Sequence, residues 1–312
     1  AIPRVSQITA MTTLEAYNLQ KNYRQRGKIV AAVRGLSLTI EPGEVLAFLG
    51  SNGAGKTTSI KMIAGLIRPD RGSVKIAGRD PHRHPQARRL VGAVLEGNRN
   101  LYWRLTPEEN LEYFGVLRGL SQKIAHRQGL ALLDRFGLLS KRHTPVQGLS
   151  RGMQQKLAIA VALVHQPRLL LLDEPTLGLD VEASQRVKTM VREMAQAGCA
   201  ILLTTHQLNV AQEIADRVAI IQQGQIIALE PTRQIIQRFS GSTYAIAIEG
   251  CLDQVRLSKL EALGGVVQKG EIIYPGTPEG LYQVLQILNP LPLVQVKKDE
   301  ADLTKVFLKL VG

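Results

Sequence analysis

The chain has 312 residues, enough for about two domains, and apolar residues make up 45% of it against 21% charged residues, as in a globular protein. No run reaches the roughly 18 unbroken apolar residues that a membrane-spanning helix needs, and two cysteines are too few for a disulfide framework or a cysteine metal cluster. The net charge of +13 is uneven. Residues 241–312 hold 7 basic and 8 acidic residues (−1), so residues 1–240 carry +14, which favours anionic partners such as nucleotides, nucleic acid or an acidic membrane surface.

The predicted elements begin after residues 1–12, which we expect to be a disordered leader. From there to about residue 230, apolar runs alternate with amphipathic stretches, which predicts an α/β layer architecture. Thr106, Pro107 and Glu109 form a helix-start pattern, and the chain from there to about residue 163 is predicted to be mostly helical. Strands are predicted over residues 44–49, 90–95, 168–173, 201–205 and 218–222, with a helix over residues 56–66.

The pattern changes near residue 240, where Gly241 and Ser242 predict a linker. Beyond it, strands are predicted over residues 244–248 and 271–274 and a helix over residues 281–288, which indicates a small α+β domain over residues 241–312. Near the C-terminus, four apolar residues would share one face of an amphipathic helix. They are Leu303, Val306, Phe307 and Leu310.

The most specific motif follows the predicted strand over residues 44–49. It fits the phosphate-binding pattern of a glycine, four residues and Gly-Lys-Thr. Its members are Gly50, Ser51, Asn52, Gly53, Ala54, Gly55, Lys56 and Thr57. Glycines let the backbone curl so that N–H groups point at phosphate oxygens, and the next helix directs its positive end there. Lys56 would add charge at the outer phosphates, and the Thr57 hydroxyl can ligate Mg²⁺.

Two further motifs carry polar groups suited to a phosphate site. The apolar strand over residues 168–173 ends in Asp173 and Glu174. Adjacent strand residues point to opposite sides, so one carboxylate is expected to serve the metal and the other to polarise an attacking water. Ser150 and Gly152 open a predicted helix, where a hydroxyl and free N–H groups can face an anion. Taken singly, the first motif is equally a solvated acidic strand end and the second an ordinary helix cap.

Together these motifs resemble those of ATP-binding cassette (ABC) transporter ATPase subunits. The resemblance rests on the phosphate loop, the signature at residues 149–153, the Asp173-Glu174 pair, the turn at residues 178–180 and Thr-Thr-His at residues 204–206, in the family's order and spacing. It covers about residues 14–229. It implies a P-loop ABC cassette over residues 13–240, with a helical signature lobe at about residues 97–165 and the small α+β domain following.

The resemblance also implies a role for each matching residue. Glu174 would be the general base, His206 would contact the terminal phosphate and position water, and Lys56 would complete the catalytic set. Mg²⁺ would be held by Thr57, Asp173 and Glu96. ATP would be bound by residues from two subunits, of which Tyr23 stacks on adenine and Ser150, Gly152 and Asp180 act across the dimer. The set is Tyr23, Gly50, Ser51, Asn52, Gly53, Ala54, Gly55, Lys56, Thr57, Thr58, Ser150, Gly152 and Asp180.

Two positions depart from the family pattern. Arg151 stands where the commonest signature has glycine, which should be tolerated if its side chain points outward. Glu96 stands where the family usually has glutamine touching the metal and water. An ionised glutamate accepts hydrogen bonds but cannot donate them, so we expect activity to survive with an altered metal dependence.

In the family, the segment after this strand receives a helix of the membrane permease. The resemblance therefore places the permease contact near residues 96–105, which include the chain's single tryptophan, Trp103, beside Tyr102 and Arg104. Such residues are frequent in interface hot spots. The alternative is that Trp103 packs inside the helical lobe.

We therefore predict an ATP-hydrolysing subunit, with ATP and Mg²⁺ as cofactors, that lies peripherally on the cytoplasmic side of the cell membrane. Two copies, expected to be a homodimer, would close head to tail around two MgATP and drive a separate permease. The C-terminal domain resembles that of exporters of the multidrug, antibiotic-resistance and polysaccharide type, although an importer subunit would differ only in partner and tail.

Two alternatives belong to other classes. A soluble ABC ATPase acting on nucleic acid or ribosomes would suit the positive charge. However, the single phosphate loop and the lack of a long heptad insertion argue against it, and no nucleic-acid partner is expected. An ATP-dependent scaffold that binds without turnover is disfavoured by Glu174 and His206.

Overall fold

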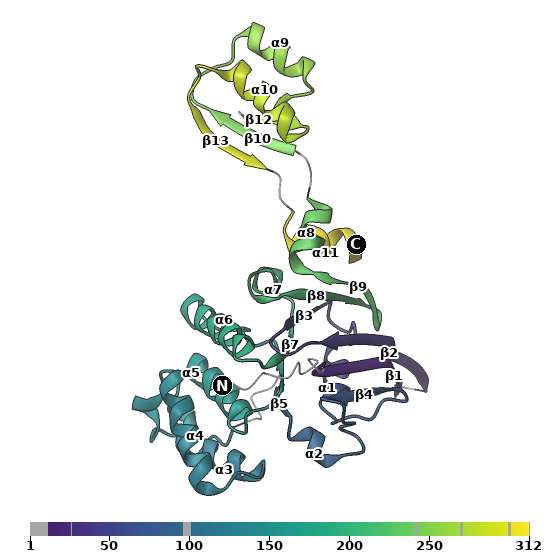
Figure 1. Ribbon diagram of the computed structural model, residues 1–312, viewed down its shortest axis with the longest axis vertical. Coiled ribbons are helices and arrows are strands. Elements are labelled where there is room, and N and C mark those ends of the chain that lie inside the picture. The colour runs from purple at the N-terminus through teal and green to yellow at the C-terminus, as the bar shows by residue number, and fades with distance from the viewer. Residues whose placement is uncertain are drawn as a thin grey trace, which may run out of the picture. The chain divides into compact units, whose positions relative to one another are not determined.

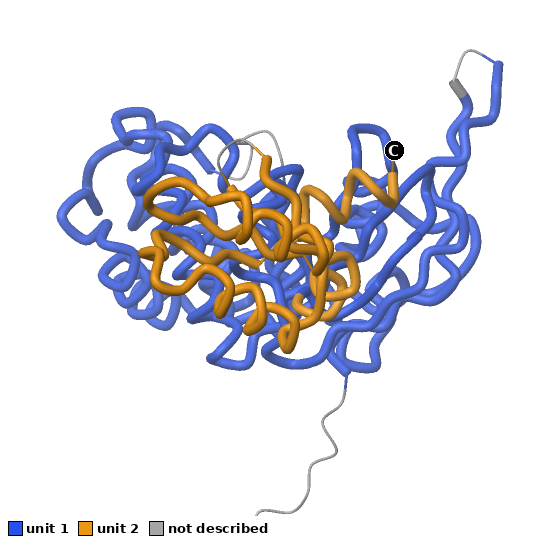
Figure 2. The backbone as a smooth tube through the Cα atoms, turned by 90° about the horizontal axis from the view of Figure 1, so that it is seen from above, with its two compact units in different colours: residues 1–232 blue, residues 233–312 orange. Residues whose placement is uncertain are grey.

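The computed structural model describes residues 12–25, 27–95, 101–240, 243–268, 271–298 and 301–311. Its contacts divide the chain into two compact units, residues 1–232 and residues 233–312 (Figure 2). The expected boundary after residue 240 lies eight residues beyond this division, which places nearly all of helix α8 (Thr232–Phe239) in the second unit. Residues 1–11 of the expected leader, Glu96 and the pair Gly241 and Ser242 lie outside the described residues. None of the helices in the described ranges is both long enough and apolar enough to span a membrane.

The first unit is built on a six-stranded sheet in the order β5-β6-β7-β3-β8-β9 (Figure 1). Its first five strands run parallel, and β9 adds an antiparallel edge. Each of the five predicted strands is confirmed to within about a residue at its ends. The six strands of the sheet, of which all but β9 were predicted, are β3 (Val45–Leu49), β5 (Val91–Val94), β6 (Leu169–Asp173), β7 (Ala200–Thr205), β8 (Arg217–Gln222) and β9 (Gln225–Pro231).

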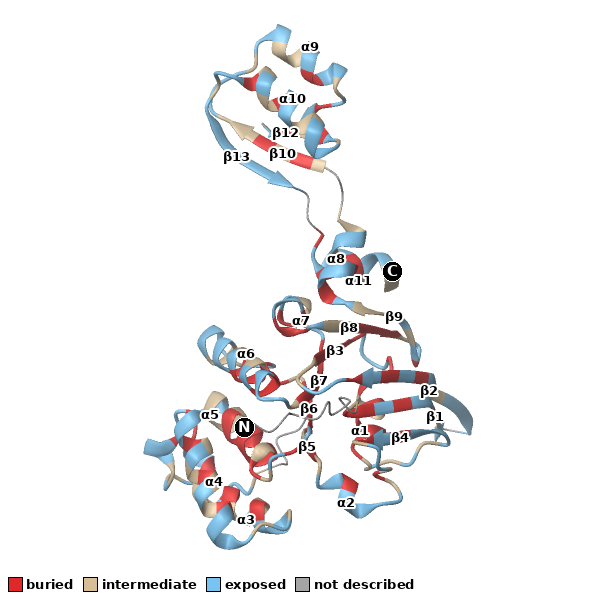
Figure 3. Ribbon diagram, viewed as in Figure 1, coloured by how far each residue is buried: buried red, intermediate tan, exposed pale blue. Residues whose placement is uncertain are grey.

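The central strands of this sheet are buried along their whole length. Every residue of β3, β6 and β7 is buried, as expected where helices and a second sheet cover both faces (Figure 3). Because parallel strands end at the same sheet edge, the segments that follow β3, β6 and β7 meet there. At these strand ends lie the phosphate loop, the pair Asp173 and Glu174, and His206.

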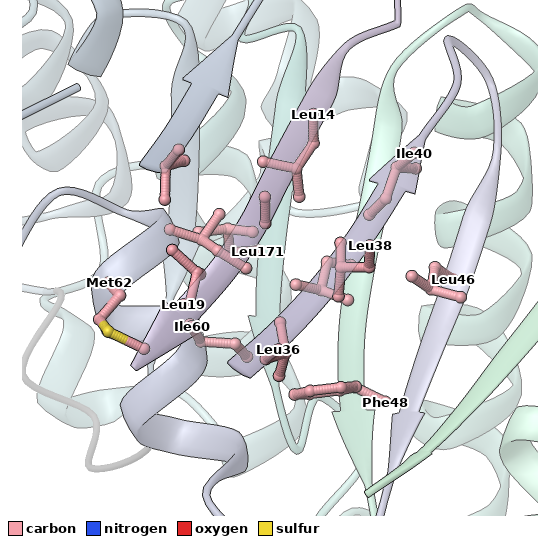
Figure 4. Packing of buried hydrophobic residues seen from close by; sticks show 14 of the residues in the cluster. Leu14, Leu19, Leu36, Leu38, Ile40, Leu46, Phe48, Ile60, Met62 and Leu171 are labelled. Carbon is pink, nitrogen blue, oxygen red and sulfur yellow. The ribbon is translucent and has the colours of Figure 1, made fainter. Parts of the chain in front are cut away.

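A three-stranded antiparallel sheet in the order β2-β1-β4 covers the phosphate-loop side of the core and was not predicted. Its strands are β1 (Leu14–Gln25), β2 (Lys28–Ile40) and β4 (Arg71–Ile76). Leu19 and Leu36 pack with Ile60 of helix α1 (Lys56–Ile63) and Phe48 of β3 in one apolar cluster (Figure 4). The period-two pattern that would have revealed this sheet is broken by register shifts in β1, at Ala16/Leu19 and Lys21/Asn22.

Helices complete the first unit. The helical lobe consists of α3 (Pro107–Leu117), α4 (Gln122–Arg135), two short 3₁₀ turns and α5 (Arg151–Leu163). Thr106 caps α3 in the capping box that its sequence predicts, with the Thr106 hydroxyl accepting from the Glu109 N–H. The other helices of the unit are α2 (Pro85–Arg88), α6 (Val181–Gln196) and α7 (Leu208–Ile214).

The second unit has a core of its own. Four of its strands form an antiparallel sheet in the order β11-β12-β10-β13, and with two helices they make the split βαβ arrangement. In chain order the elements are β10 (Thr243–Ile248), α9 (Gln254–Ala262), β11 (Val266–Gln268), β12 (Glu271–Pro275), α10 (Pro278–Leu288) and β13 (Leu293–Lys298). Ile246, Ile272 and Val284 are at most 1% exposed within it. In α11 (Leu303–Val311), Leu303 and Val306 are buried, on the face that the sequence predicts to be apolar.

Candidate active site

The phosphate-binding motif forms the loop between β3 and α1 and borders a cavity of about 480 Å³. The cavity is lined by three groups of residues that the topology brings to one sheet edge. They are Ala32; the motif residues Gly50, Ser51, Asn52, Gly53, Gly55, Lys56, Thr57 and Thr58; and, from the next strands, Asp173, Glu174, Leu177 and His206.

Two glycines of the loop are required by close backbone approach. A Cβ on Gly50 would lie 2.6 Å from the Ile221 carbonyl oxygen, and one on Gly55 would lie 2.4 Å from the Ala32 carbonyl oxygen. Gly55 also has a φ of +106°, in the left-handed region that glycine adopts at little cost. The Gly224 N–H donates to the Ala54 carbonyl over 2.9 Å, which ties the loop to the turn between β8 and β9.

Lys56 starts α1 with its side chain drawn into the loop. Its ammonium donates to the Gly50 carbonyl over 2.7 Å and to the Ser51 carbonyl over 3.1 Å, and the residue is 8% exposed. The charge therefore lies within the curl of the loop and beside the first turn of α1. This is a built anion site, with a fixed cation and a helix N-terminus at the same place.

Asp173 and Glu174 both line the cavity, although alternation along a strand predicts that they point to opposite sides. The reason is that β6 ends at Asp173, and Glu174 turns away with a φ of +50°. The expectation of opposite faces is therefore wrong, because the alternation stops with the strand. The two carboxylates remain different: Asp173 is 5% exposed and accepts from the Thr204 hydroxyl, whereas Glu174 contacts His206.

One oxygen of each carboxylate is buried and has no hydrogen-bond partner in the described part of the chain. These are Asp173 Oδ2 and Glu174 Oε2. Buried carboxylate oxygens are costly unless paired, so both atoms suit a cation or a proton donor arriving with a ligand. The His206 Nδ1 lies 2.9 Å from Glu174 Oε1, and the His206 side chain is 52% exposed. The imidazole can therefore orient Glu174 while reaching the cavity.

The remaining predicted site residues lie outside the lining of this cavity. Tyr23 is 38% exposed near the end of β1, and Ala54 is buried within the loop. Three others start helices. Ser150 caps α5 by accepting from the Met153 N–H, Gly152 follows it, and Asp180 caps α6 by accepting from the Ala183 N–H at 2.7 Å. Ala32 and Leu177 line the cavity and were not predicted, since neither residue type carries a phosphate-binding signal.

Arg151, the signature departure, is exposed on the first turn of α5. Its guanidinium carbon is 2.6 Å from where a Cβ on Gly178 would be, so the side chain lies against the turn that follows Glu174. The side chain thus connects the signature helix to that turn. Trp103 is 46% exposed, beside Tyr102 at 48%.

Comparisons with known proteins point in one direction. The profile of the ABC transporter family matches residues 33–177. The chain is 39% identical to the ABC transporter ATP-binding protein NatA of Bacillus subtilis, over 66% of this chain and 85% of that protein. It is 36% identical to the Nod factor export ATP-binding protein I of Burkholderia lata, over 94% and 96%. It is also 36% identical to the daunorubicin/doxorubicin resistance ATP-binding protein DrrA of Streptomyces peucetius, over 73% and 69%.

Solved structures agree with these sequence matches. An ATP-binding subunit of an ABC transporter superposes with a TM-score of 0.65 at 33% identity, over 73% of this chain and 93% of the other. A dimeric ATP-binding cassette in a post-hydrolysis state, bound to ADP and Pi, has a TM-score of 0.64 at 27% identity, over 70% and 99%.

Proposed function

Because the chain belongs to the ABC transporter family, as an ATP-binding subunit, we propose that it hydrolyses ATP in the cavity described above to drive an exporter. The observation that carries the proposal is the juxtaposition of Lys56 with Asp173 and Glu174 around one cavity, where each carboxylate has one buried oxygen without a hydrogen bond. A cation-bearing phosphate loop facing two such carboxylates suits a magnesium–nucleotide complex and little else.

The donor set fits Mg²⁺. Asp173 and Thr57 both line the cavity, and Asp173 Oδ2 is buried without a hydrogen-bond partner in the described part of the chain. Oxygen donors of this kind are the ligands that Mg²⁺ prefers, so Thr57 and Asp173 would hold it. The third predicted ligand, Glu96, lies outside the described residues. When bound, the ion would neutralise charge on the outer phosphates.

The chain's own residues then divide the work. Lys56 and the loop N–H groups bind and orient the phosphates. Glu174 accepts a proton from the attacking water, because it lines the cavity and its Oε2 has no hydrogen bond in the described part of the chain. His206 holds the other carboxylate oxygen in place through its 2.9 Å contact. The Thr204 hydroxyl fixes Asp173 in the same way.

Export is supported by relatives that match both units. The Nod factor export protein and the linearmycin resistance protein LnrL of Bacillus subtilis match 94% and 96% of this chain, so the similarity extends through the second unit. We propose that two copies close head to tail, so that Ser150 and Gly152 of one copy complete the site of the other. A separate permease would contact the helical lobe near Tyr102 and Trp103, and the subunit would lie at the cytoplasmic face of the membrane.

Glu174→Gln tests the catalytic assignment. The amide keeps the size of the side chain but cannot take up a proton, so phosphate release should fall by at least ~100-fold while ATP binding persists. Phosphate release and nucleotide binding are measured on the same sample. Glu182→Gln, an exposed glutamate on α6, is the matched control and should retain full turnover. Turnover by Glu174→Gln within twofold of wild type would remove Glu174 from its role.

Ser150→Arg tests the head-to-tail dimer. In the Glu174→Gln background, ATP should shift the chain from monomer to dimer in size-exclusion chromatography with light scattering, and the arginine should block that shift by filling the composite site. Ser258→Arg adds the same side chain on α9 and should leave the shift intact. Since Ser150 caps α5, thermal unfolding is recorded to show that the variant is folded. Normal ATP-dependent dimers of Ser150→Arg would contradict this arrangement.

A further inference from the structure

A second cluster of metal-ligating side chains lies in the helical lobe, on two helices that contribute no residue to the lining of the active-site cavity. Glu108 and Glu112 stand one turn apart on α3, and His126 faces them from α4. One ligand atom from each residue lies within 4.8 Å of the other two, and within the described ranges this is the one such group of three or more. The helical hairpin therefore brings together donors separated by 14 to 18 positions in the sequence.

The donor atoms of the three residues lie close together. His126 Nδ1 is 2.5 Å from Glu112 Oε1 and 3.4 Å from Glu108 Oε1. In a tetrahedral zinc site, with bonds of about 2.0 to 2.2 Å, ligand atoms lie roughly 3.3 Å apart. The Glu108 contact already has this spacing, and the Glu112 contact would need to open by less than an ångström. Glu112 can do so because its carboxylate is at the end of a flexible side chain.

Glu108 adds a separate observation. Its side chain is only 18% exposed, and its Oε2 is buried without a hydrogen-bond partner in the described part of the chain. His143 Nδ1 lies 3.4 Å and the Arg142 guanidinium Nε 3.8 Å from this oxygen. A carboxylate that is this buried and incompletely paired gains more from a dication than an exposed one does.

His143 orients the cluster from outside. Its Nε2 accepts from Arg142 Nε over 2.9 Å, so the proton of the neutral ring is on Nδ1, which faces Glu108 Oε2. Polar groups outside a metal site commonly hold its ligating carboxylates in place, and His143 lies where it could do so for Glu108. Access is open, since the His126 side chain is 44% exposed and that of Glu112 is 27% exposed.

We propose that Glu108, Glu112 and His126 form a binding site for a divalent transition-metal ion of the Zn²⁺ class, with water in the fourth position. Two carboxylates and one imidazole suit Zn²⁺, Co²⁺, Fe²⁺ or Mn²⁺, and the nitrogen donor disfavours Mg²⁺ and Ca²⁺. The two carboxylates balance the charge of the ion. When bound, the ion joins α3 to α4 and so stiffens the lobe that carries the signature helix.

The test uses the full chain and Co²⁺, whose visible absorption reports its coordination. With Mg²⁺ in excess, titration should give one Co²⁺ per chain, with the strong visible bands of a four-coordinate site, and Zn²⁺ should displace it. His126→Gln and Glu112→Gln, which keep side-chain size, should each weaken binding by at least ~10-fold. His84→Gln removes an exposed histidine elsewhere and should change nothing. Thermal unfolding confirms that each variant is folded.

A second background separates this site from the active site, whose carboxylates and His206 could also take up Co²⁺. In His206→Ala the absorption bands should remain, and adding His126→Gln should abolish them. Bands that disappear in His206→Ala would assign the metal to the ATP cavity and overturn the proposal. Failure of the wild-type chain to take up Co²⁺ would also overturn it and leave the three residues as ion pairs between two helices.

Discussion

His165, at the end of α5, is a residue whose protonation the fold opposes. Its Nε2 donates to the Val91 carbonyl over 3.1 Å, while its Nδ1 is buried without a hydrogen bond in the described part of the chain. Burial, and secondarily the positive charge of Arg118, lowers the pKa of His165 from 6.5 to about 4, against a smaller opposing effect of the Val91 carbonyl. The imidazole is therefore neutral in the folded chain at neutral pH.

This predicts a loss of stability in acid. Between pH 6.5 and pH 4 the unfolded chain binds a proton at this histidine and the folded chain does not, so the free energy of unfolding falls as the pH is lowered. The lowering of the pKa of His165 from 6.5 to about 4 corresponds to a total loss of roughly 3 kcal/mol in the free energy of unfolding.

His165→Gln can keep the hydrogen bond to Val91 but does not titrate. Urea unfolding at pH 7 and at pH 4.5 should show a smaller loss of stability for this variant than for wild type. His84→Gln, at an exposed position, serves as the control. If His165→Gln and wild type lose the same stability between the two pH values, the buried imidazole is not the source.

Sequence predicted most of the active site at this scale because its chemistry is local. Residues 50–57 and the Asp173-Glu174 pair are contiguous motifs, and the strands that carry them follow from apolar runs. Ala32 could not be predicted, since it reaches the cavity through the pairing of β2 in a sheet that has no clear sequence pattern. Glu108, Glu112 and His126 were missed for the same reason: the packing of α3 on α4 brings them together, and no spacing encodes it.

At the scale of elements, helix starts are where sequence predicts structure best. Thr106 and Glu109 form a reciprocal pair of hydrogen bonds, with the Glu109 carboxylate accepting from the Thr106 N–H over 2.7 Å. That bond, with the one from the Thr106 hydroxyl, holds the pKa of Glu109 below its usual value. The pattern needs only four adjacent residues, so it can be recognised without the fold.

Thr106→Ala should destabilise the first unit by about 1 kcal/mol, because the Glu109 N–H at the start of α3 loses its acceptor and the Glu109 carboxylate loses the bond from the hydroxyl. Urea unfolding followed by circular dichroism measures the change. Thr189→Ala, in the middle of α6, is the matched control, and it should be neutral or slightly stabilising because alanine favours helix. A cost below a few tenths of a kcal/mol at Thr106 would show that the cap is replaced by water.

The antiparallel sheet shows where prediction by elements stops. Leu14, Leu19, Leu36 and Leu38 are at most 3% exposed. Leu36 and Leu38 have the even spacing of a regular strand, but Leu14 and Leu19 in β1 are five positions apart. The bulges in β1 shift the register, and only the pairing with β2 and β4 restores a single apolar face. Likewise, three residues of β11 and a fully exposed β13 carry no burial pattern that sequence could reveal.

At the scale of the whole molecule, each of the two units has an apolar cluster of its own within the described residues. One cluster joins the antiparallel sheet, α1 and the six-stranded sheet, and the other lies within the split βαβ unit. All residues that line the cavity of the active site fall between positions 32 and 206, in the first unit. A core substitution in the first unit is therefore expected to reduce ATP hydrolysis, whereas one in the second unit is expected to leave it unchanged.

Ile272→Ala should destabilise the second unit by about 2 to 5 kcal/mol, because it removes buried methyl groups from a side chain that is 1% exposed. Scanning calorimetry should show part of the unfolding at a lower temperature, while phosphate release from MgATP at 20 °C stays within twofold of wild type. Leu171→Ala, in the core of the first unit, is the contrasting variant. It should lower both the unfolding temperature and the rate of phosphate release. Parallel loss of turnover in Ile272→Ala would show that the second unit supports hydrolysis.

The backbone of Glu174 has a consequence for how this chain can be improved. Its φ of +50° costs an L-residue about 1 to 2 kcal/mol relative to glycine, and with this backbone Glu174 lines the same cavity as Asp173. Glycine at this position would relax the main chain yet discard the carboxylate that we propose activates water. A substitution here that raises thermal stability would therefore lower turnover. Stabilising substitutions should be made at other positions.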